Sequence, residues 1–243
     1  MTTRSVQPSP IEPSPIEPSP TKTSPTKTRR IEMAGLACLV AGLFGAAGGI
    51  YLALRTPLVG EDMWTYPQRA GGEFATTQTI FAVTHLGLIL GLLALWWCGA
   101  VPHNRLGRIG HVVAVSGMAL LTINELVAIS VAGEATDSAH AGTVGAIYGV
   151  ATLLIGLGMI AEGIAAVRDG EWSGWQRWLP LVLGIWLFVP TMPALFLEGD
   201  VARLALTGWG LLFAVLGWVL WRHNSTAASR QARSTPQARS FPA

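Results

Sequence analysis

The residues best placed for chemistry lie within residues 110–132, an almost wholly apolar stretch that contains Asn124 and Glu125. An ionisable side chain in hydrocarbon costs at least a few kcal/mol, so it normally faces a protein interior or a water-filled cavity. A second apolar stretch, residues 78–98, contains His85. We therefore expect Glu125 to face inward and any functional site to be built around it.

Counting residues along these stretches places the two ionisable groups at the same depth. His85 is the eighth residue of the span predicted over 78–98, and Glu125 is the eighth residue from the outer end of the span over 110–132. At 1.5 Å of rise per residue, both lie roughly 10–12 Å below the same edge of the apolar zone. Helices joined by a short connection are usually neighbours, so the spacing predicts a contact between them. Asn124 and Thr191 fall near the same level.

This group allows a functional and a structural interpretation. A buried pair of this kind can bind a proton or a cation, with Glu125 as base or counter-ion and His85 as its titrating partner. Pro190 and Pro193 each remove a helical hydrogen bond, so the carbonyls left unpaired beside Thr191 could line a small polar cavity. In the structural alternative, the His–Glu pair only joins two helices and the prolines only bend the chain for packing.

A second polar pair, His111 and Glu162, lies near the opposite side of the predicted membrane region. These residues could form an inner relay that works with Glu125. Alternatively, Glu162 could form a structural salt bridge with one of the nearby arginines. The sequence contains no familiar nucleophile, phosphate-loop or zinc-protease motif, and no two carboxylates are spaced to hold a metal. We therefore expect no metal, no cofactor and no enzymatic activity.

The elements that carry these residues are predicted to be membrane-spanning helices. Of the 243 residues, 51% are hydrophobic and 12% are charged, against roughly 25% charged in a soluble domain. Six apolar segments are near the roughly 20 residues that a helix needs to cross a bilayer. They cover residues 34–54, 78–98, 110–132, 143–167, 178–197 and 202–221. Without water, each must satisfy its backbone internally, which predicts an all-α bundle of six transmembrane helices in a lipid bilayer.

The distribution of basic residues predicts the orientation of this bundle. If both termini are cytoplasmic, the inner regions hold thirteen Lys and Arg residues and the outer loops hold three, Arg55, Arg69 and Arg203. Such a bias is typical of cytoplasmic loops and tails. The formal charge of +2 is spread over loops and tails, so it does not indicate a nucleic-acid partner.

The two ends of the chain differ in composition from the middle. Residues 1–32 are rich in Pro, Ser and Thr, which predicts a disordered cytoplasmic tail. Residues 33–222 form the predicted transmembrane domain. Residues 223–243 are rich in Ser and Arg and are predicted to be a second disordered tail.

Two patterns concern how the helices pack. Matches 67 residues apart, such as Leu90-Gly91 with Leu157-Gly158, suggest a parallel repeat in which spans 2–3 correspond to spans 4–5. Small residues one turn apart, Gly45 with Gly49 and Gly87 with Gly91, let helix backbones approach closely. These Gly-rich faces could pack within the chain, or bind a second copy or a partner membrane protein.

At WTYP (64–67), FAVTHLGLILG (81–91), NELVAISVA (124–132) and WLPLVLGIWLFVPTMPALF (178–196), the chain resembles six-span inner-membrane proteins of high-GC bacteria. The resemblance implies a bacterial plasma-membrane location and no assigned activity. The sequence leaves two main functions open, while a third, an intramembrane enzyme, would need a second carboxylate or histidine within hydrogen-bond reach of Glu125 and an access path. The first is a small transporter or sensor with a polar site at His85 and Glu125, and the second is a non-transporting scaffold or accessory subunit.

Overall fold

A computed structural model describes residues 25–54, 72–135, 137–195, 197 and 201–234. Six of its helices are long and apolar enough to cross a membrane, and the described residues contain no strand. The prediction of an all-α bundle with six membrane-length helices is confirmed. The segment 55–71, which holds most of the longest predicted outer loop, lies outside the described residues, as do residues 1–24.

The helices follow one another along the chain, joined by short connections where these are described. They are α1 (Pro25–Ala53), α2 (Gly72–Trp97), α3 (Arg105–Ala128) with the 3-10 turn η1 (Ile129–Val131), α4 (Ala139–Asp169), η2 (Gly174–Trp178), α5 (Leu179–Trp186), η3 (Leu187–Thr191), α6 (Met192–Ala194) and α7 (Val201–Ser234). The fifth membrane span is thus assembled from η2, α5, η3 and α6.

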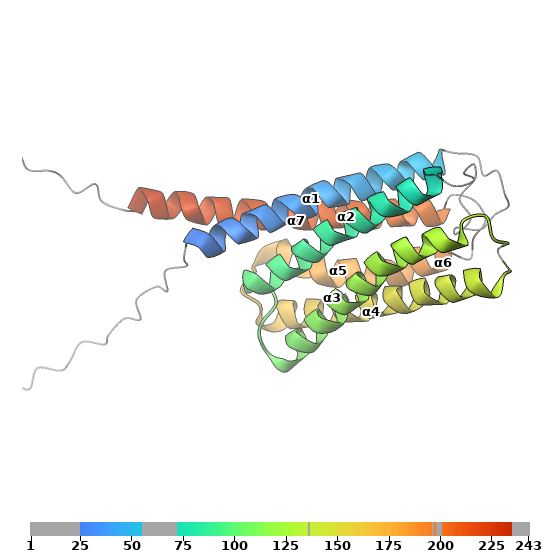
Figure 1. Cartoon of the computed structure of the whole chain (residues 1–243). Helices are drawn as coiled ribbons and strands as arrows, with labels where there is room; N and C mark the ends of the chain where they lie inside the picture. Colours follow the sequence, from blue (N-terminus) through green and yellow to red (C-terminus); the bar gives the residue numbers. More distant parts are fainter. Residues whose placement is uncertain (1–24, 55–71, 136, 196, 198–200, 235–243) are drawn as a thin grey trace, which may run out of the picture.

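The bundle has two groups of helices, with α2 between them (Figure 1). The first and last long helices, α1 and α7, pack against each other along their length, and α1 also packs on α2. In turn α2 packs on α3, α3 on α4, and α4 on α5. Of the polar residues predicted to form sites, His85 lies on α2, His111, Asn124 and Glu125 lie on α3, and Glu162 lies on α4, whereas Thr191 lies in η3.

Glycines permit the close approach of α1 and α7. Gly35 and Gly42 lie two turns apart on one face of α1, and Gly210 and Gly217 are spaced in the same way on α7. A Cβ atom added to Gly42 would lie 2.5 Å from the backbone nitrogen of Ala214 and 2.6 Å from the carbonyl oxygen of Gly210. These obstacles are backbone atoms that cannot rotate away, so the seam requires glycine.

The predicted small-residue motifs also face the inside of the chain. Gly87 and Gly91 on α2 meet Ala41 and Cys38 of α1. On α1, Gly49 meets Thr207 of α7, while Gly45 lies against Thr84 of α2. The interpretation of these motifs as internal packing is supported. The alternative, that these glycines present a face to a second copy or a partner, stays a prediction.

Both terminal helices extend into segments predicted to be disordered. Helix α1 begins at Pro25, within the tail predicted over residues 1–32, and α7 continues to Ser234, within the tail predicted over residues 223–243. Proline is tolerated in the first turn of a helix, and no further proline follows Pro25 before the apolar span. Past residue 222, Ala, Arg and Gln favour helix, and the next proline is Pro236.

The predicted parallel repeat of spans 2–3 and 4–5 is not confirmed. Helix α3 is regular from Arg105 to Ala128, whereas the fifth span contains the π-helical segment η3. The π-turn is centred on Pro190, which lacks a backbone N–H, and the N–H of Met192 donates to the carbonyl of Leu187 five residues earlier. The proline therefore gives span 5 a local geometry that has no counterpart in α3.

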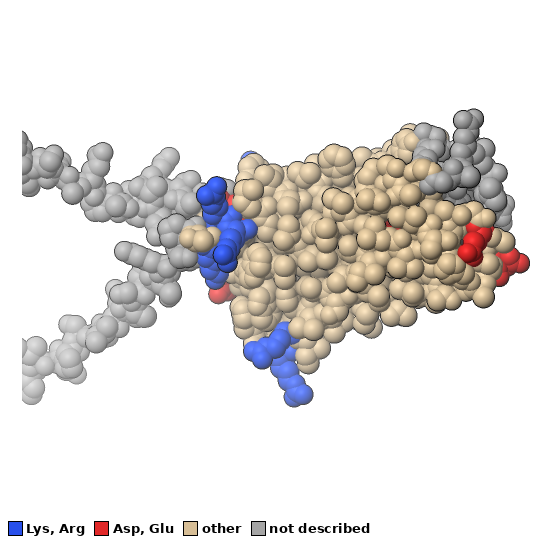
Figure 2. All heavy atoms as spheres, viewed as in Figure 1, with Lys and Arg blue, Asp and Glu red and all other residues tan. Residues whose placement is uncertain are grey.

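Charges separate to the two ends of the bundle. In Figure 2, Lys and Arg side chains gather at one end together with a few acidic ones, a broad and mainly uncharged band covers the middle of the visible face, and the charged side chains seen at the far end are acidic. We call these the basic end and the acidic end. The basic end holds Lys27, Arg29 and Arg30 at the start of α1, Arg105 and Arg108 at the start of α3, Arg168 at the end of α4, Arg177 in η2 and Arg222 on α7. Glu134 and Asp137, between α3 and α4, lie at the acidic end.

Candidate functional site in the membrane bundle

Helix α3 turns Glu125 toward the protein interior. Its buried residues recur at helical spacing, and Gly117, Leu121, Glu125 and Ala128 share one face. The side chains of Asn124 and Glu125 are almost fully buried, at 1% and 6% residue exposure. The expectation that Glu125 faces inward thus agrees with its position in the structure.

Glu125 contacts side chains from both neighbouring helices. Its Oε2 accepts a hydrogen bond from the phenolic oxygen of Tyr148 on α4 at 2.8 Å. Its Oε1 lies 3.7 Å from Nδ1 of His85 on α2. The amide nitrogen of Gln78, also on α2, donates to the Tyr148 oxygen at 3.1 Å. We call these four side chains, Gln78, His85, Glu125 and Tyr148, the polar network.

The chemistry of the groups fixes the direction of these hydrogen bonds. A phenol has one hydrogen, and Tyr148 gives it to Glu125, so the Tyr148 oxygen must accept from Gln78. The contacting atom of Gln78 is therefore its amide nitrogen rather than its carbonyl oxygen. Gln78 thus donates to Tyr148, and Tyr148 donates to Glu125, which only accepts.

Several buried atoms around Glu125 have no hydrogen-bond partner. They are Nδ1 of His85, Oε1 of Gln78 and Oδ1 of Asn124. The Asn124 amide nitrogen donates to the carbonyl of Val144 at 3.1 Å, which leaves its oxygen as the free atom. Each buried polar atom left unpaired costs about 1–3 kcal/mol. These three atoms belong to α2 and α3, the helices that carry His85 and Glu125.

The distance between the His85 and Glu125 side chains determines whether a proton can pass between them. At 3.7 Å, Nδ1 and Oε1 are close enough for electrostatic attraction but too far apart for a hydrogen bond. The gap is also too small to hold a water molecule between the two atoms. A small movement of α2 against α3 would bring them into hydrogen-bonding distance, which would allow one proton to pass between them.

Thr191 lies apart from the network in its hydrogen bonding. It is buried, at 2% exposure, within the π-turn of span 5, and its Oγ1 has no hydrogen-bond partner. Nearby, the indole nitrogen of Trp186 donates to the carbonyl of Ala205 on α7 at 2.8 Å. The predicted participation of Thr191 in the site therefore stays a prediction.

The structure also brings His111 and Glu162 together, from α3 and α4. His111 Nδ1 lies 2.7 Å from Glu162 Oε1, and the Glu162 side chain is fully buried. The Trp96 ring stacks on the His111 ring with centroids 4.9 Å apart and planes 17° apart. The alternative in which an arginine pairs with Glu162 is wrong, because its other oxygen has no hydrogen-bond partner and His111 holds the first.

The two His–Glu pairs form separate centres. His111 and Glu125 are fourteen residues apart on the same helix, which corresponds to about 21 Å along its axis. That distance is far beyond direct proton transfer between side chains. The proposed relay from Glu125 to His111 and Glu162 would therefore need intervening proton carriers, and it stays a prediction.

Sequence reasoning missed Gln78, Tyr148 and Trp96. Gln78 lies seven residues before His85, which places both on one face of α2. Tyr148 lies near the depth of Glu125, but its hydroxyl was not considered as a partner. Both could have been found by searching every span for polar atoms at that depth. Trp96 gave no such signal, because a tryptophan near a helix end is also typical of an interfacial anchor.

Comparisons with known proteins give no family assignment. No family model, no curated protein and no solved structure matches this chain. The resemblance to bacterial six-span proteins consequently remains an expectation from the sequence. Within the described part of the chain, no three His, Cys, Asp or Glu side chains gather to hold a metal ion.

Proposed function

We propose that the polar network binds and releases a proton inside the membrane, and that the protein is a small proton-linked transporter or a proton-responsive sensor. The observation that carries this proposal is the approach of His85 Nδ1 to within 3.7 Å of Glu125 Oε1, with no hydrogen bond satisfying the histidine nitrogen. The proposal builds on the fold, since six apolar, membrane-length helices make this a multi-pass membrane protein.

The surroundings of Glu125 suit a group that changes protonation. With one proton shared between them, His85 and Glu125 form either an ion pair or two neutral groups. Both of these states have zero net charge, which avoids the large cost of an isolated charge in a low-dielectric interior. Release of the shared proton leaves neutral His85 and one carboxylate charge on Glu125, which accepts the hydrogen bond from Tyr148. The hydrogen bond from Tyr148 favours the ionised carboxylate, while burial favours the neutral acid. Because the hydrogen bond and burial act in opposite directions, Glu125 can adopt both the ionised and the neutral form.

The proposed orientation places the basic end in the cytoplasm and the network in the outer half of the membrane. Its support is the excess of Lys and Arg at that end. Because six spans separate them, the start of α1 and the end of α7 both lie there. We further propose that the host membrane is a bacterial plasma membrane, in line with the resemblance in sequence.

The alternative function is a non-transporting scaffold or accessory subunit. The observation that favours it is the backbone contact of Gly42 with Gly210 and Ala214, which joins the two terminal helices tightly. A bundle held in this way along α1 and α7 suits a rigid structural role. The same contact is also compatible with a transporter whose moving parts are α2, α3 and α4.

Proton flux in liposomes tests the proposal. The full-length protein is reconstituted with a pH-sensitive dye inside, and a potassium diffusion potential drives proton movement. A transporter should acidify or alkalinise the lumen, and Glu125→Gln and His85→Ala should each abolish that flux. Glu32→Gln, which removes a carboxylate from the basic end of α1, is the matched control and should behave as wild type.

A sensor would give a different result in a second measurement. Without flux, hydrogen exchange of residues 78–85 of α2, which carry Gln78 and His85, should still change with pH in the wild type and lose that change in Glu125→Gln. If the wild type shows neither flux nor a pH-dependent exchange pattern, the network is structural and the scaffold function is favoured. A flux that both substitutions leave unchanged would also contradict the assigned site.

A further inference from the structure

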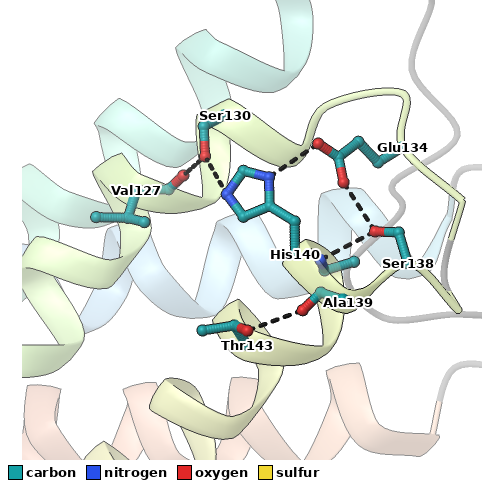
Figure 3. Close-up of polar contacts among 8 residues, drawn as sticks. Val127, Ser130, Glu134, Ser138, Ala139, His140 and Thr143 are labelled. Atoms are coloured by element: carbon teal, nitrogen blue, oxygen red, sulfur yellow. Dashed lines mark hydrogen bonds and ion pairs between the residues drawn. The ribbon is translucent and has the colours of Figure 1, made fainter.

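A cluster of hydrogen bonds joins α3 to α4 at the acidic end of the bundle (Figure 3). His140, in the first turn of α4, lies between the two sides of this hairpin. Its Nδ1 is 2.8 Å from Oε1 of Glu134 in the connecting segment, and its Nε2 is 3.2 Å from Oγ of Ser130 in η1. Half of its side chain is exposed, so it can exchange protons with the surrounding solution.

The contacts of Ser130 determine the state of one ring nitrogen. Ser130 donates its single hydroxyl hydrogen to the carbonyl of Val127 at 2.7 Å. Toward His140 it can therefore only accept, which requires a hydrogen on Nε2. Figure 3 shows both contacts meeting at the Ser130 hydroxyl.

The contacts of Glu134 determine the state of the other nitrogen. Ser138 accepts a hydrogen bond from the backbone N–H of Ala141 and donates its own hydrogen to Glu134 Oε2 at 2.7 Å. The hydrogen bond from His140, followed by that from Ser138, lowers the pKa of Glu134. The ionised carboxylate can only accept, so Nδ1 of His140 must also carry a hydrogen. With both nitrogens protonated, the His140 in this arrangement is an imidazolium.

The way α3 packs on α4 makes this cluster important. Toward the basic end the two helices meet through glycines: a Cβ on Gly110 or on Gly117 would lie 2.8 Å from a backbone nitrogen of α4. Toward the acidic end they are joined by polar contacts instead, from Asn124 to Val144 and from Tyr148 to Glu125. At the acidic end, therefore, α3 and α4 can separate when the hydrogen bonds between them break.

We propose that His140 is a pH-dependent latch, which in its doubly protonated form ties Ser130 and Glu134 to the start of α4. Loss of one ring proton removes the donor to one of these partners and frees the acidic end of the α3–α4 pair. The contact between Tyr148 and Glu125 lies about two turns deeper along α4 and loosens with it. This last step, control of the polar network by the latch, rests on the proposed function.

The groups that face the latch are few among the described side chains. Glu134 is the charged partner of His140, and Ser130 and Ser138 are its neutral neighbours. Asp137, in the same connecting segment, is exposed to solvent. Glu125 and His85 lie deeper in the bundle, so their titration can be followed separately through Glu125→Gln.

Hydrogen exchange of the full chain in lipid nanodiscs between pH 5 and pH 8, corrected for intrinsic exchange rates, tests the latch. In the wild type, protection of residues 127–131 and 139–144 should fall about three- to tenfold as pH rises, the loss expected for one hydrogen bond. His140→Ala should show low protection at every pH. His103→Ala, which removes an exposed histidine at the basic end, is the matched control and should follow the wild type.

Ser130→Ala provides a second variant that keeps the histidine and its pairing with Glu134. In this variant, exchange protection should still fall as pH rises, but by less than in the wild type, since only the contact between His140 and Glu134 remains. A flat profile in the wild type, or a wild-type response in His140→Ala, would overturn the latch. Flux that is independent of Glu125 alongside a normal latch response would instead contradict the proposed function and leave the latch standing.

Discussion

Tyr148 on α4 donates its phenolic hydrogen to Glu125 on α3 across 2.8 Å, and it accepts a hydrogen bond from Gln78 on α2. One side chain thus links three helices around the carboxyl group deepest in the acidic-end half of the bundle. The tyrosine both satisfies one carboxylate oxygen and leaves the other directed toward His85. Its removal should affect the network more than the loss of one hydrogen bond on the surface.

We expect Tyr148→Phe to destabilise the protein by about 1–3 kcal/mol, because Glu125 Oε2 and the Gln78 amide would both lose their partner in a buried place. The measurement is the free energy of unfolding in mixed micelles. Thr79→Val, which removes an exposed hydroxyl from α2 that bonds only a carbonyl of its own helix, is the control and should change stability by less than about 0.5 kcal/mol. Equal effects of the two substitutions would contradict the buried network.

The inner pair is expected to be strongly coupled. His111→Leu leaves the fully buried Glu162 without its partner and should cost about 3–5 kcal/mol. The double variant His111→Leu with Glu162→Leu should cost less than His111→Leu alone, since no buried polar group is then left unpaired. A double-mutant cycle of unfolding free energies measures this coupling, and strict additivity would show that the pair is not energetically linked.

The glycine seam between α1 and α7 makes a prediction about steric fit. Gly42→Ala places a methyl group 2.5 Å from the backbone of Ala214 and should destabilise the bundle by about 1–3 kcal/mol. Gly149→Ala on α4 is the control, because a Cβ there meets nothing within 4 Å. That substitution should be neutral or stabilising by up to about 1 kcal/mol. Thermal unfolding of both variants in the same detergent distinguishes them.

Acidic pH should destabilise the connection between α3 and α4 through protonation of Glu134. Its pKa is lowered from the ordinary value of 4.5, first by the hydrogen bond from His140. A carboxylate with a lowered folded-state pKa stabilises the folded form above its ordinary pKa, and that stabilisation is lost as pH falls through the lowered value. Exchange protection of the segment between α3 and α4 should therefore decline as the pH falls below the ordinary range of a carboxyl group. Glu134→Gln should remove this acid limb without affecting exchange in α7.

Much of the architecture could be predicted because hydrocarbon imposes few choices on a chain. Apolar runs of bilayer length identified the six spans, and the depth count placed His85 and Glu125 at the same level. Helix ends were harder to place, because the stretches after Pro25 and after Arg222 are polar and yet free of proline. Polarity alone does not distinguish a helix that projects beyond the membrane from a disordered tail.

The composition of the site could be predicted only in part. Hydropathy indicates how deep a residue lies but not which way its side chain points. The sequence therefore predicts Thr191 as a site residue but does not predict Tyr148 and Gln78 as partners of Glu125. Choosing between His111 and an arginine as the partner of Glu162 required knowing that Gly110 lets α3 approach α4 closely at that level. Contact partners depend on such steric details, and a single sequence does not display them.

The seam between α1 and α7 also bears on how the bundle is made. Gly35 and Gly217 meet across it although most of the chain separates them. During synthesis, α1 enters the membrane long before its principal neighbour exists. Until the sixth span is inserted, the glycine-lined face of α1 has no partner from α7, so the contact between these two helices forms only after the four spans between them have been made.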